Sequence, residues 1–291
     1  MKIAALGDIH IYQLITWPWH LLGKRSLGMA NLWLRRRGLF NIALLQNVLD
    51  QITAIKPDVV LFTGDFTTTA LHREFASLQV ILEPFLQSHR GVIVPGNHDR
   101  YSFASHRTRR METYFGQHMP KTYPHVEQLT DTWQLMAIDS AVPRVSTSRG
   151  RLGDTQLNAI TQKLSQMKTD QGMIVLSHYP VVTPDDVNML AHHRLEEAQA
   201  LAQALRECPG QIIMFHGHVH RPWHLPVTDR FTDINVGSPT MTRPPTIHGQ
   251  GFWEVHLPDT ATNQPSYIHH EPQHQISALT GKIEWLSTVV P

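Results

Sequence analysis

Residues able to bind metal ions follow five apolar runs of this sequence. Each run has the composition of a buried strand and ends in a short segment that carries aspartate, asparagine or histidine. Carboxylate, imidazole and amide groups suit divalent ions of the manganese, iron and zinc class, and none of these positions offers a thiolate. The sequence therefore predicts a metal site built from Asp8, His10, Asp65, Asn97, His178, His218 and His220.

The number and charge of these side chains indicate what the site would do. More than six protein ligands suit two ions, because a single octahedral ion would leave no room for a substrate. Two divalent ions bring four positive charges, against which Asp8 and Asp65 supply only two negative ones. Such a site favours an anionic substrate such as phosphate. A water bridging the two ions would have a depressed pKa and would attack phosphorus in line, while the ions hold the non-bridging oxygens.

Two further polar residues follow Asn97 directly. His98 is placed to protonate the leaving oxygen or to stabilise the transition state, and Asp99 is placed to orient that imidazole. We therefore expect His98 and Asp99 to be catalytic.

The elements that must position these residues alternate between strands and helices. Apolar runs predict strands that open the stretches 2–10, 58–65, 91–99, 133–139, 172–180 and 211–220. Helical periodicity predicts helices from Ile42 to a stop at Pro57, through Phe75, Leu78 and Leu82, from near Asp154, and from about Arg194 to Glu207. Short strands follow in the final third. This order predicts one α/β domain over 1–291, in which the carboxyl ends of the strands meet and gather the polar residues.

Composition narrows the class of protein. With 291 residues and 41% hydrophobic residues the chain can build a sizeable core. Its net charge of only +1 gives no reason to expect nucleic acid as a partner. Cys208 is the only cysteine, which excludes an internal disulfide and suits a reducing compartment. Because no apolar stretch approaches the ~18 residues of a membrane span, we expect a cytoplasmic protein.

The ordered blocks "GDIH" (7–10), "GD" (64–65), "GNHD" (96–99), "SH" (177–178) and "GHVH" (217–220) resemble those of the calcineurin-like metallophosphoesterase superfamily, in its bacterial phosphodiesterase and pyrophosphatase branch. The resemblance implies a four-layer α/β/β/α sandwich with two metal ions, for which manganese is favoured over iron and zinc. It assigns one ion to Asp8, His10 and His220, the other to Asn97, His178 and His218, and Asp65 to both. His98 would be the catalytic histidine that binds no metal.

An insert at about 12–40 has a distinct composition. It contains tryptophans and a run of three arginines, and residues 11–49 contain no aspartate or glutamate. The insert suits an amphipathic element at an anionic membrane surface or a cap over a lipid-linked substrate; the alternative is a helix packed on the core with a solvated basic edge. Because arginine binds phosphate bidentately, the expected substrate contacts are Arg35, Arg36, Arg37, Arg149, Arg151 and Arg194.

Three functions remain open at this point. The first is hydrolysis of a phosphodiester or pyrophosphate in a lipid-linked nucleotide such as UDP-2,3-diacylglucosamine, with peripheral contact to the inner face of the membrane. The second is hydrolysis of a soluble cyclic nucleotide, for which the basic insert would only pack on the core. The third is a metal-bound scaffold without activity, against which the complete ligand set and His98 argue.

Overall fold

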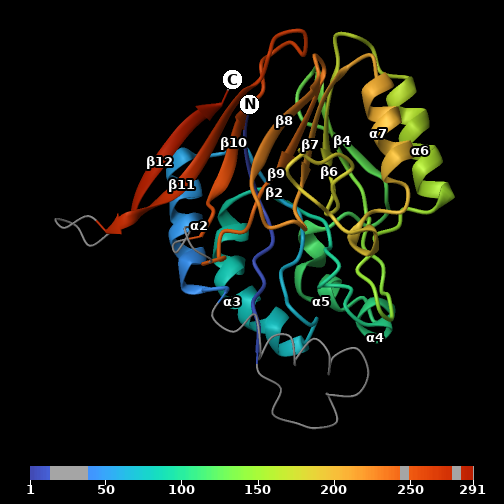
Figure 1. The fold of residues 1–291 in the computed structure, drawn as a ribbon. Coiled ribbons are helices and arrows are strands. Elements are labelled where there is room, and N and C mark those ends of the chain that lie inside the picture. The colour runs from blue at the N-terminus through green and yellow to red at the C-terminus, as the bar shows by residue number, and fades with distance from the viewer. Residues whose placement is uncertain (14–38, 243–248, 277–282, 291) are drawn as a thin grey trace.

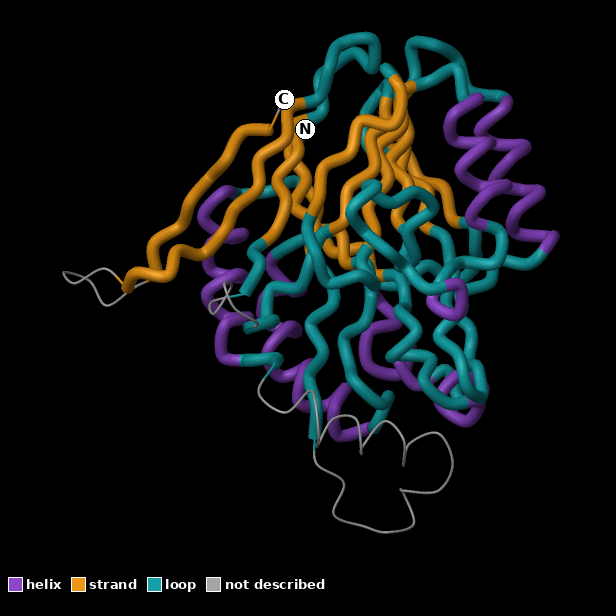
Figure 2. Tube along the Cα trace, in the orientation of Figure 1, coloured by secondary structure: helices purple, strands orange, loops and turns teal. Residues whose placement is uncertain are grey.

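The computed structural model describes residues 1–13, 39–242, 249–276 and 283–290. Within these ranges two six-stranded sheets stand face to face, with helices on their outer sides (Figure 1). The first sheet has the order β12-β11-β10-β1-β2-β3, and the second has the order β4-β5-β6-β7-β9-β8. Figure 2 shows the two groups of strands between the helices.

The first sheet combines strands from both ends of the chain. Its parallel part is β1 (Lys2–Leu6), β2 (Val59–Phe62) and β3 (Gly91–Ile93). Three antiparallel strands extend it on the other side of β1, and they are β10 (Phe252–His256), β11 (Ser266–Ile276) and β12 (Ile283–Val290). The N-terminus is therefore held inside the sheet, beside strands from the last fifth of the sequence.

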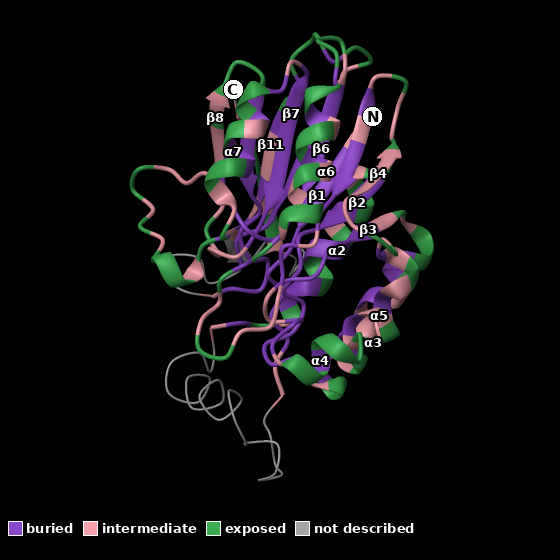
Figure 3. Ribbon diagram, turned by 90° about the vertical axis from the view of Figure 1, so that its right-hand side faces the viewer, coloured by how far each residue is buried: buried purple, intermediate pink, exposed green. Residues whose placement is uncertain are grey.

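The second sheet is parallel at its centre. Its central strands are β5 (Trp133–Ala137), β6 (Gly172–Leu176), β7 (Gln211–His216) and β9 (Phe231–Asn235). Antiparallel strands close its two edges, and they are β4 (His125–Gln128) and β8 (Trp223–Thr228). Parallel strands are buried on both faces, and every residue of β6 and β7 is buried (Figure 3).

Three hydrophobic clusters define four layers. Alternate residues of the first sheet, such as Leu6 and Phe62, pack outward against α2 (Ala43–Ile55) and α3 (His72–Ser88). Outward residues of the second sheet pack with buried residues of α6 (Asp154–Ser165) and α7 (Ala198–Glu207). The inward residues of both sheets form the cluster between them. The expected α/β/β/α sandwich is confirmed, and this shared core supports the expectation of one domain, which stays a prediction.

Most predicted elements are present, with a few differences. The last predicted helix begins at Ala198 instead of about Arg194, because Leu195 pairs with Gly150 in a parallel bridge. Two edge strands were not predicted: β4 has the polar sequence HVEQ, and β8 contains Pro226. The short helices α4 (Phe103–Arg107) and α5 (Arg110–Phe115), together with the 3-10 turns Gly116–His118 and Ala191–His193, were also not predicted. These elements are too short to show a clear periodicity of apolar residues, so the sequence gives little indication of them.

Most of the basic insert, with Arg35, Arg36 and Arg37, lies outside the described residues. The expectations of a membrane element and of substrate contacts by these arginines therefore stay predictions. Within the described ranges, no helix combines the length and the apolar character that crossing a bilayer requires.

Removal of a buried side chain between the sheets should destabilise the whole sandwich. Leu61 is fully buried in this layer, so we expect Leu61→Ala to lower the free energy of unfolding by about 2–5 kcal/mol through lost burial and a residual cavity. Val80 lies on α3 and is 77% exposed, so Val80→Ala should change the free energy of unfolding by less than about 0.5 kcal/mol. Urea denaturation measures both, and equal effects would contradict the shared core.

Candidate metal centre

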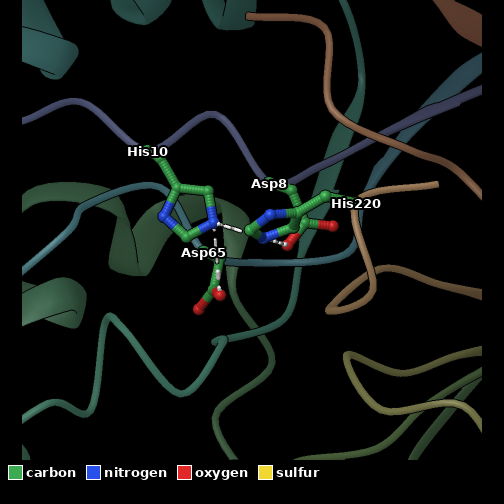
Figure 4. A group of neighbouring side chains, drawn as sticks. All are labelled: Asp8, His10, Asp65 and His220. Carbon is green, nitrogen blue, oxygen red and sulfur yellow. Dashed lines mark hydrogen bonds and ion pairs between the residues drawn. The ribbon is translucent and has the colours of Figure 1, made fainter. Parts of the chain in front are cut away.

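The predicted ligands form two adjoining groups at the carboxyl ends of the parallel strands. In the first group, ligand atoms of Asp8, His10, Asp65 and His220 lie within 4.8 Å of one another, and Figure 4 shows these side chains directed toward a common point. In the second group the same limit holds for Asp65, His178 and His218. Asp65 belongs to both groups, as a ligand that bridges two ions must.

Distances within the groups are those of converging donors. In the first group His10 Nε2 lies 2.8 Å from His220 Nε2 and 3.6 Å from Asp65 Oδ2. In the second group Asp65 Oδ2 lies 3.3 Å from His178 Nε2. Asn97 Oδ1 completes that group, 3.1 Å from His178 Nε2 and 2.8 Å from His218 Nδ1. The seven predicted residues are thus brought together from loops after five strands.

Backbone carbonyls select which ring nitrogen faces the centre. His178 Nδ1 donates to Thr63 O at 2.8 Å, which leaves Nε2 for the centre. His218 is oriented the other way, because its Nε2 donates to His193 O at 2.8 Å and leaves Nδ1. A hydrogen bond at one imidazole nitrogen fixes the tautomer and presents the other nitrogen as a ligand.

The environment of Asp65 fits a divalent ion. Its Oδ1 accepts a hydrogen bond from His98 N at 2.7 Å. Its Oδ2 is buried and, among the described residues, has no hydrogen-bond donor. A buried carboxylate oxygen without a donor is costly unless a cation satisfies it. With Asp, Asn and His as the donor set, the residues present fit two divalent ions of the manganese, iron or zinc class.

The histidines keep the carboxylates ionised. Burial by itself raises the pKa of Asp8, but His220 and His10 outweigh it and hold that pKa below its ordinary value. Burial acts in the same direction on Asp65, and again the histidines, His178 foremost, hold its pKa well below its ordinary range. Burial and the neighbouring His178 lower the pKa of His218 to about 3, which keeps this imidazole neutral. Burial lowers the pKa of His178, but Asp65 outweighs it and raises that pKa to about 9. Ionised carboxylates and neutral imidazoles are the forms that bind metal, so His178 would release a proton when it binds an ion.

The backbone is strained where it presents these side chains. Asp8, His10, Asp65, His218 and His220 all have a positive φ, between 51° and 72°. This left-handed conformation costs a residue with a Cβ roughly 1–2 kcal/mol. Its concentration at the predicted ligands indicates that the loops are bent to aim these side chains, at the expense of stability.

Two glycines allow the loops to approach the carboxylates. A Cβ on Gly96 would lie 2.1 Å from Asp65 Oδ1, and a Cβ on Gly217 would lie 2.0 Å from Asp8 Oδ2. No side chain can occupy either position while the carboxylate stays where it is. The glycines of "GNHD" and "GHVH" are therefore required by the close approach of backbone to ligand.

The two predicted catalytic residues have different surroundings. His98 borders the centre, and its Nδ1 donates to Thr68 O at 2.6 Å. Asp99 is fully buried, and its carboxylate accepts hydrogen bonds from the backbone nitrogens of Gly96, Phe66 and Thr67. The expectation that Asp99 orients the imidazole needs correction: a backbone carbonyl holds the ring, and Asp99 fixes the loop that carries it.

A cavity of about 330 Å³ opens beside the centre. His98 and residues of both ligand groups line it, together with Ser148, His193 and Val219 and a loop from Val187 to Leu190. Arg149, Arg151 and Arg194 lie in the flanking loops and are not among the described residues that line it. Arg151 Nε lies 3.8 Å from Glu196, and Arg194 Nε donates to Met189 O at 2.9 Å. This placement gives no support to the three as substrate contacts.

Several residues at the centre were not predicted. Phe40 packs against the imidazole of His10 with 4.7 Å between ring centroids, and its backbone pairs with Met241. Thr63, Thr68 and His193 act through their carbonyl oxygens. A carbonyl belongs to every residue type, so no sequence signal could have identified these three.

Comparisons with known proteins agree with this geometry. A family model described as "Calcineurin-like phosphoesterase" matches residues 1–222. A 3′,5′-cyclic adenosine monophosphate phosphodiesterase of Vibrio vulnificus is 29% identical over 181 residues, which are 60% of each chain. A protein of Arcobacter nitrofigilis named "Probable glycerophosphodiester phosphodiesterase" is 25% identical over 227 residues, 76% of this chain and 72% of that one. A dimetal phosphatase of Danio rerio has the same fold, with a TM-score of 0.62, 15% identity and 98% of both chains covered.

The chain therefore belongs to the calcineurin-like phosphoesterase family. The expected resemblance, the four-layer fold and the class of metal-dependent phosphoester hydrolase are confirmed. The family uses a dinuclear divalent metal site, and the His and Asp groups fit one. The identity of the metal and the role of each residue stay predictions.

A side chain at Gly96 should disrupt the centre. We expect Gly96→Ala to displace Asp65 and to lower phosphoester hydrolase activity about 100-fold, since misplacement by about 1 Å costs that much. The matched control is Gly116→Ala: Gly116 has φ −60°, and the nearest atom to its Cβ would lie 3.7 Å away. Activity and metal content by mass spectrometry measure the difference, and two equally active variants would contradict the assignment.

Metal removal should destabilise the fold, because ions that bind only the folded chain offset the strained backbone. An ion whose free concentration is 100 times its Kd stabilises the folded state by about 2.7 kcal/mol. We expect the melting temperature to fall by several degrees on chelation and to recover with Mn²⁺. The melting temperature of Asn97→Ala, which lacks one ligand of the second group, should rise less when Mn²⁺ is added back. A melting temperature that does not respond to metal would argue against the site.

Proposed function

We propose that this chain hydrolyses a small soluble phosphodiester, with a 3′,5′-cyclic nucleotide as the first candidate. The observation that carries the proposal is the shared position of Asp65 between two ligand groups, beside a histidine and a cavity of small volume. The two groups would hold two ions around one phosphate, and the cavity would take part of what is attached to it.

The ligand groups hold the ions and set the charge of the site. Asp8, His10 and His220 would hold one ion, Asn97, His178 and His218 the other, and Asp65 both. When bound, two divalent ions supply Lewis-acid stabilisation of the phosphate oxygens and activation of water for in-line attack. Neutral Asn97 keeps the number of carboxylates at two, so the loaded site stays formally cationic and attracts a phosphodiester anion.

His98 supplies the proton. Thr68 O accepts from Nδ1, so the ring exchanges protons with the substrate through Nε2. An imidazolium there donates to the leaving oxygen as the phosphorus–oxygen bond breaks, which spares the site an alkoxide. Tyr101 packs against the ring, 5.8 Å between centroids, and the Asp99 carboxylate accepts a hydrogen bond from Gly96 N in the same loop. The ring thus keeps one orientation.

The size of the cavity supports a small substrate. About 330 Å³ is at the lower end of the range for ligand pockets, roughly 300–1,000 Å³. A mononucleotide suits this volume, although a second cavity of about 650 Å³ opens at His10, lined also by Phe40 and Thr242. The relatives named above act, by name, on a cyclic nucleotide or a glycerophosphodiester. A glycerophosphodiester is therefore the second candidate.

A lipid-linked substrate such as UDP-2,3-diacylglucosamine is neither supported nor contradicted by these relatives. The basic, tryptophan-containing insert at about 12–40, which indicated such a substrate, lies mostly outside the described residues. Membrane contact is likewise unsupported. An inactive scaffold is a weaker proposal, since both ligand groups are complete and His98 lines the cavity.

A direct assay separates the candidates. With Mn²⁺ added, we expect wild-type protein to release AMP from 3′,5′-cyclic AMP faster than it cleaves glycerophosphocholine, and to leave UDP-2,3-diacylglucosamine in detergent uncleaved. Asn97→Ala should lose the activity. Faster cleavage of glycerophosphocholine would replace the first candidate by the second, and turnover of the lipid alone would overturn both.

The role of His98 has its own test. We expect His98→Gln to lower kcat about 10²-fold to 10⁴-fold, the usual loss for a general acid, with bound metal unchanged because the ring belongs to neither ligand group. His118→Gln, in the 3-10 turn Gly116–His118, is the control and should keep its activity. Loss of bound metal together with activity would show that His98 supports the structure of the metal centre and does not act as a general acid.

A further inference from the structure

One wall of the cavity comes from a single loop. Val187, Asn188, Met189, Leu190 and His193 all line it, within seven consecutive residues. We call this stretch the 187–193 loop. It follows the strand that leads to His178, and it faces a cavity whose remaining lining is the metal centre, His98, Ser148 and Val219. The loop is therefore the largest part of the lining that the proposed chemistry does not use.

His193 connects this loop to the metal centre. Its carbonyl oxygen accepts the hydrogen bond from His218 Nε2, at 2.8 Å. Its ring is held separately, by a short hydrogen bond between Nδ1 and Ser148 Oγ. The Ser148 carbonyl in turn accepts a hydrogen bond from Tyr179, whose ring packs against His218 with 4.3 Å between centroids. Two independent connections thus fix the ring at a set position beside the second ligand group.

The rest of the loop is anchored as well. Asp186, just before it, pairs with Arg221, just after the ligand His220, at 2.6 Å. Arg194, just after it, donates to Met189 O at 2.9 Å. The loop backbone also closes on itself, since His193 N donates to Leu190 O at 2.9 Å. These contacts connect the two ends of the loop to each other and to the segment that carries His220.

The chemistry of the wall suits a group that is partly apolar and partly hydrogen-bonding. Val187, Met189 and Leu190 offer apolar surface, and Leu190 is 54% exposed at the cavity. Asn188 and the imidazole of His193 offer donors and acceptors. A sugar or nucleoside presents this combination of apolar ring faces and hydroxyl or amide groups, whereas a methyl ester presents only the apolar part.

Resting on the proposed function, we infer that His193 contacts the hydroxyl-bearing ester group of the diester, and that the 187–193 loop determines which phosphodiester is accepted. His193 is a specificity-determining residue in this proposal. It takes no part in bond breaking, and its carbonyl, which holds His218, is present whatever the side chain.

A matched pair of substrates tests the inference. Thymidine 5′-(4-nitrophenyl) phosphate and methyl 4-nitrophenyl phosphate have the same scissile bond and the same leaving group, and they differ in one ester group, a nucleoside or a methyl. The measured quantity is the ratio of kcat/KM for the two, for the Mn²⁺-loaded protein. This ratio cancels any general loss of metal or of folded protein.

We expect His193→Ala to lower kcat/KM for the thymidine diester about 10-fold to 100-fold, the cost of a hydrogen bond lost from a site built to make it, and to change that for the methyl diester less than about threefold. Ser148→Ala, which releases the ring from its hydrogen bond, should act in the same direction with a smaller effect. His192→Ala is the control. His192 is the exposed neighbour of His193, and it is not among the described residues that line the cavity.

The outcomes separate this inference from the proposed function. Equal losses for both substrates would overturn the inference and assign His193 a purely structural role, and unchanged values for both would also overturn it. A ratio that falls in the control as much as in His193→Ala would do the same. Wild-type protein that cleaves neither of these diesters nor 3′,5′-cyclic AMP, with two equivalents of metal bound, would instead overturn the proposed function.

Discussion

Everything at this centre depends on one carboxylate that two ligand groups must share. Asp65 follows the second strand of the first sheet, yet its oxygens lie near histidines that follow strands of both sheets. That is possible only where the carboxyl ends of parallel strands from two sheets meet at one edge. The face-to-face packing of the sheets, and the buried layer between them, serve this geometry.

Precision at the centre comes mainly from the backbone. Carbonyl oxygens of Thr63 and His193 set the tautomers of two predicted ligands, and that of Thr68 sets the orientation of His98. Positive φ angles aim five predicted ligand side chains, and glycines make room for the carboxylates. A polar side chain can be exchanged by one mutation, whereas these supports depend on how whole loops are folded, so the centre is defined by the fold as much as by its ligands.

The sequence was sufficient to predict most strands, the main helices and the seven polar residues that converge at the centre, because each signal is local: an apolar run followed by a residue type with metal chemistry. It was not sufficient for β4 and β8, where polar residues and Pro226 weaken the pattern. It also gave the wrong partner for Asp99. A carboxylate next to a histidine in the sequence suggests a hydrogen bond between the two, but in the folded loop the Asp99 carboxylate accepts hydrogen bonds from backbone nitrogens. The hydrogen bonds of Arg194 Nε to Met189 O and of His218 Nε2 to His193 O could not be predicted either, because they depend on the folded path of the chain.

The composition of each ligand group has a further consequence. Asp8 and His10 follow a strand of the first sheet, but their partner His220 is 210 residues away from His10 and follows a strand of the second. The other group joins Asn97 of the first sheet to His178 and His218 of the second in the same way. Ions bound here would be crosslinks that close chain loops of this length, as disulfides do in secreted proteins. In a chain with a single cysteine, the metal ions that take part in catalysis would thus also crosslink the two sheets.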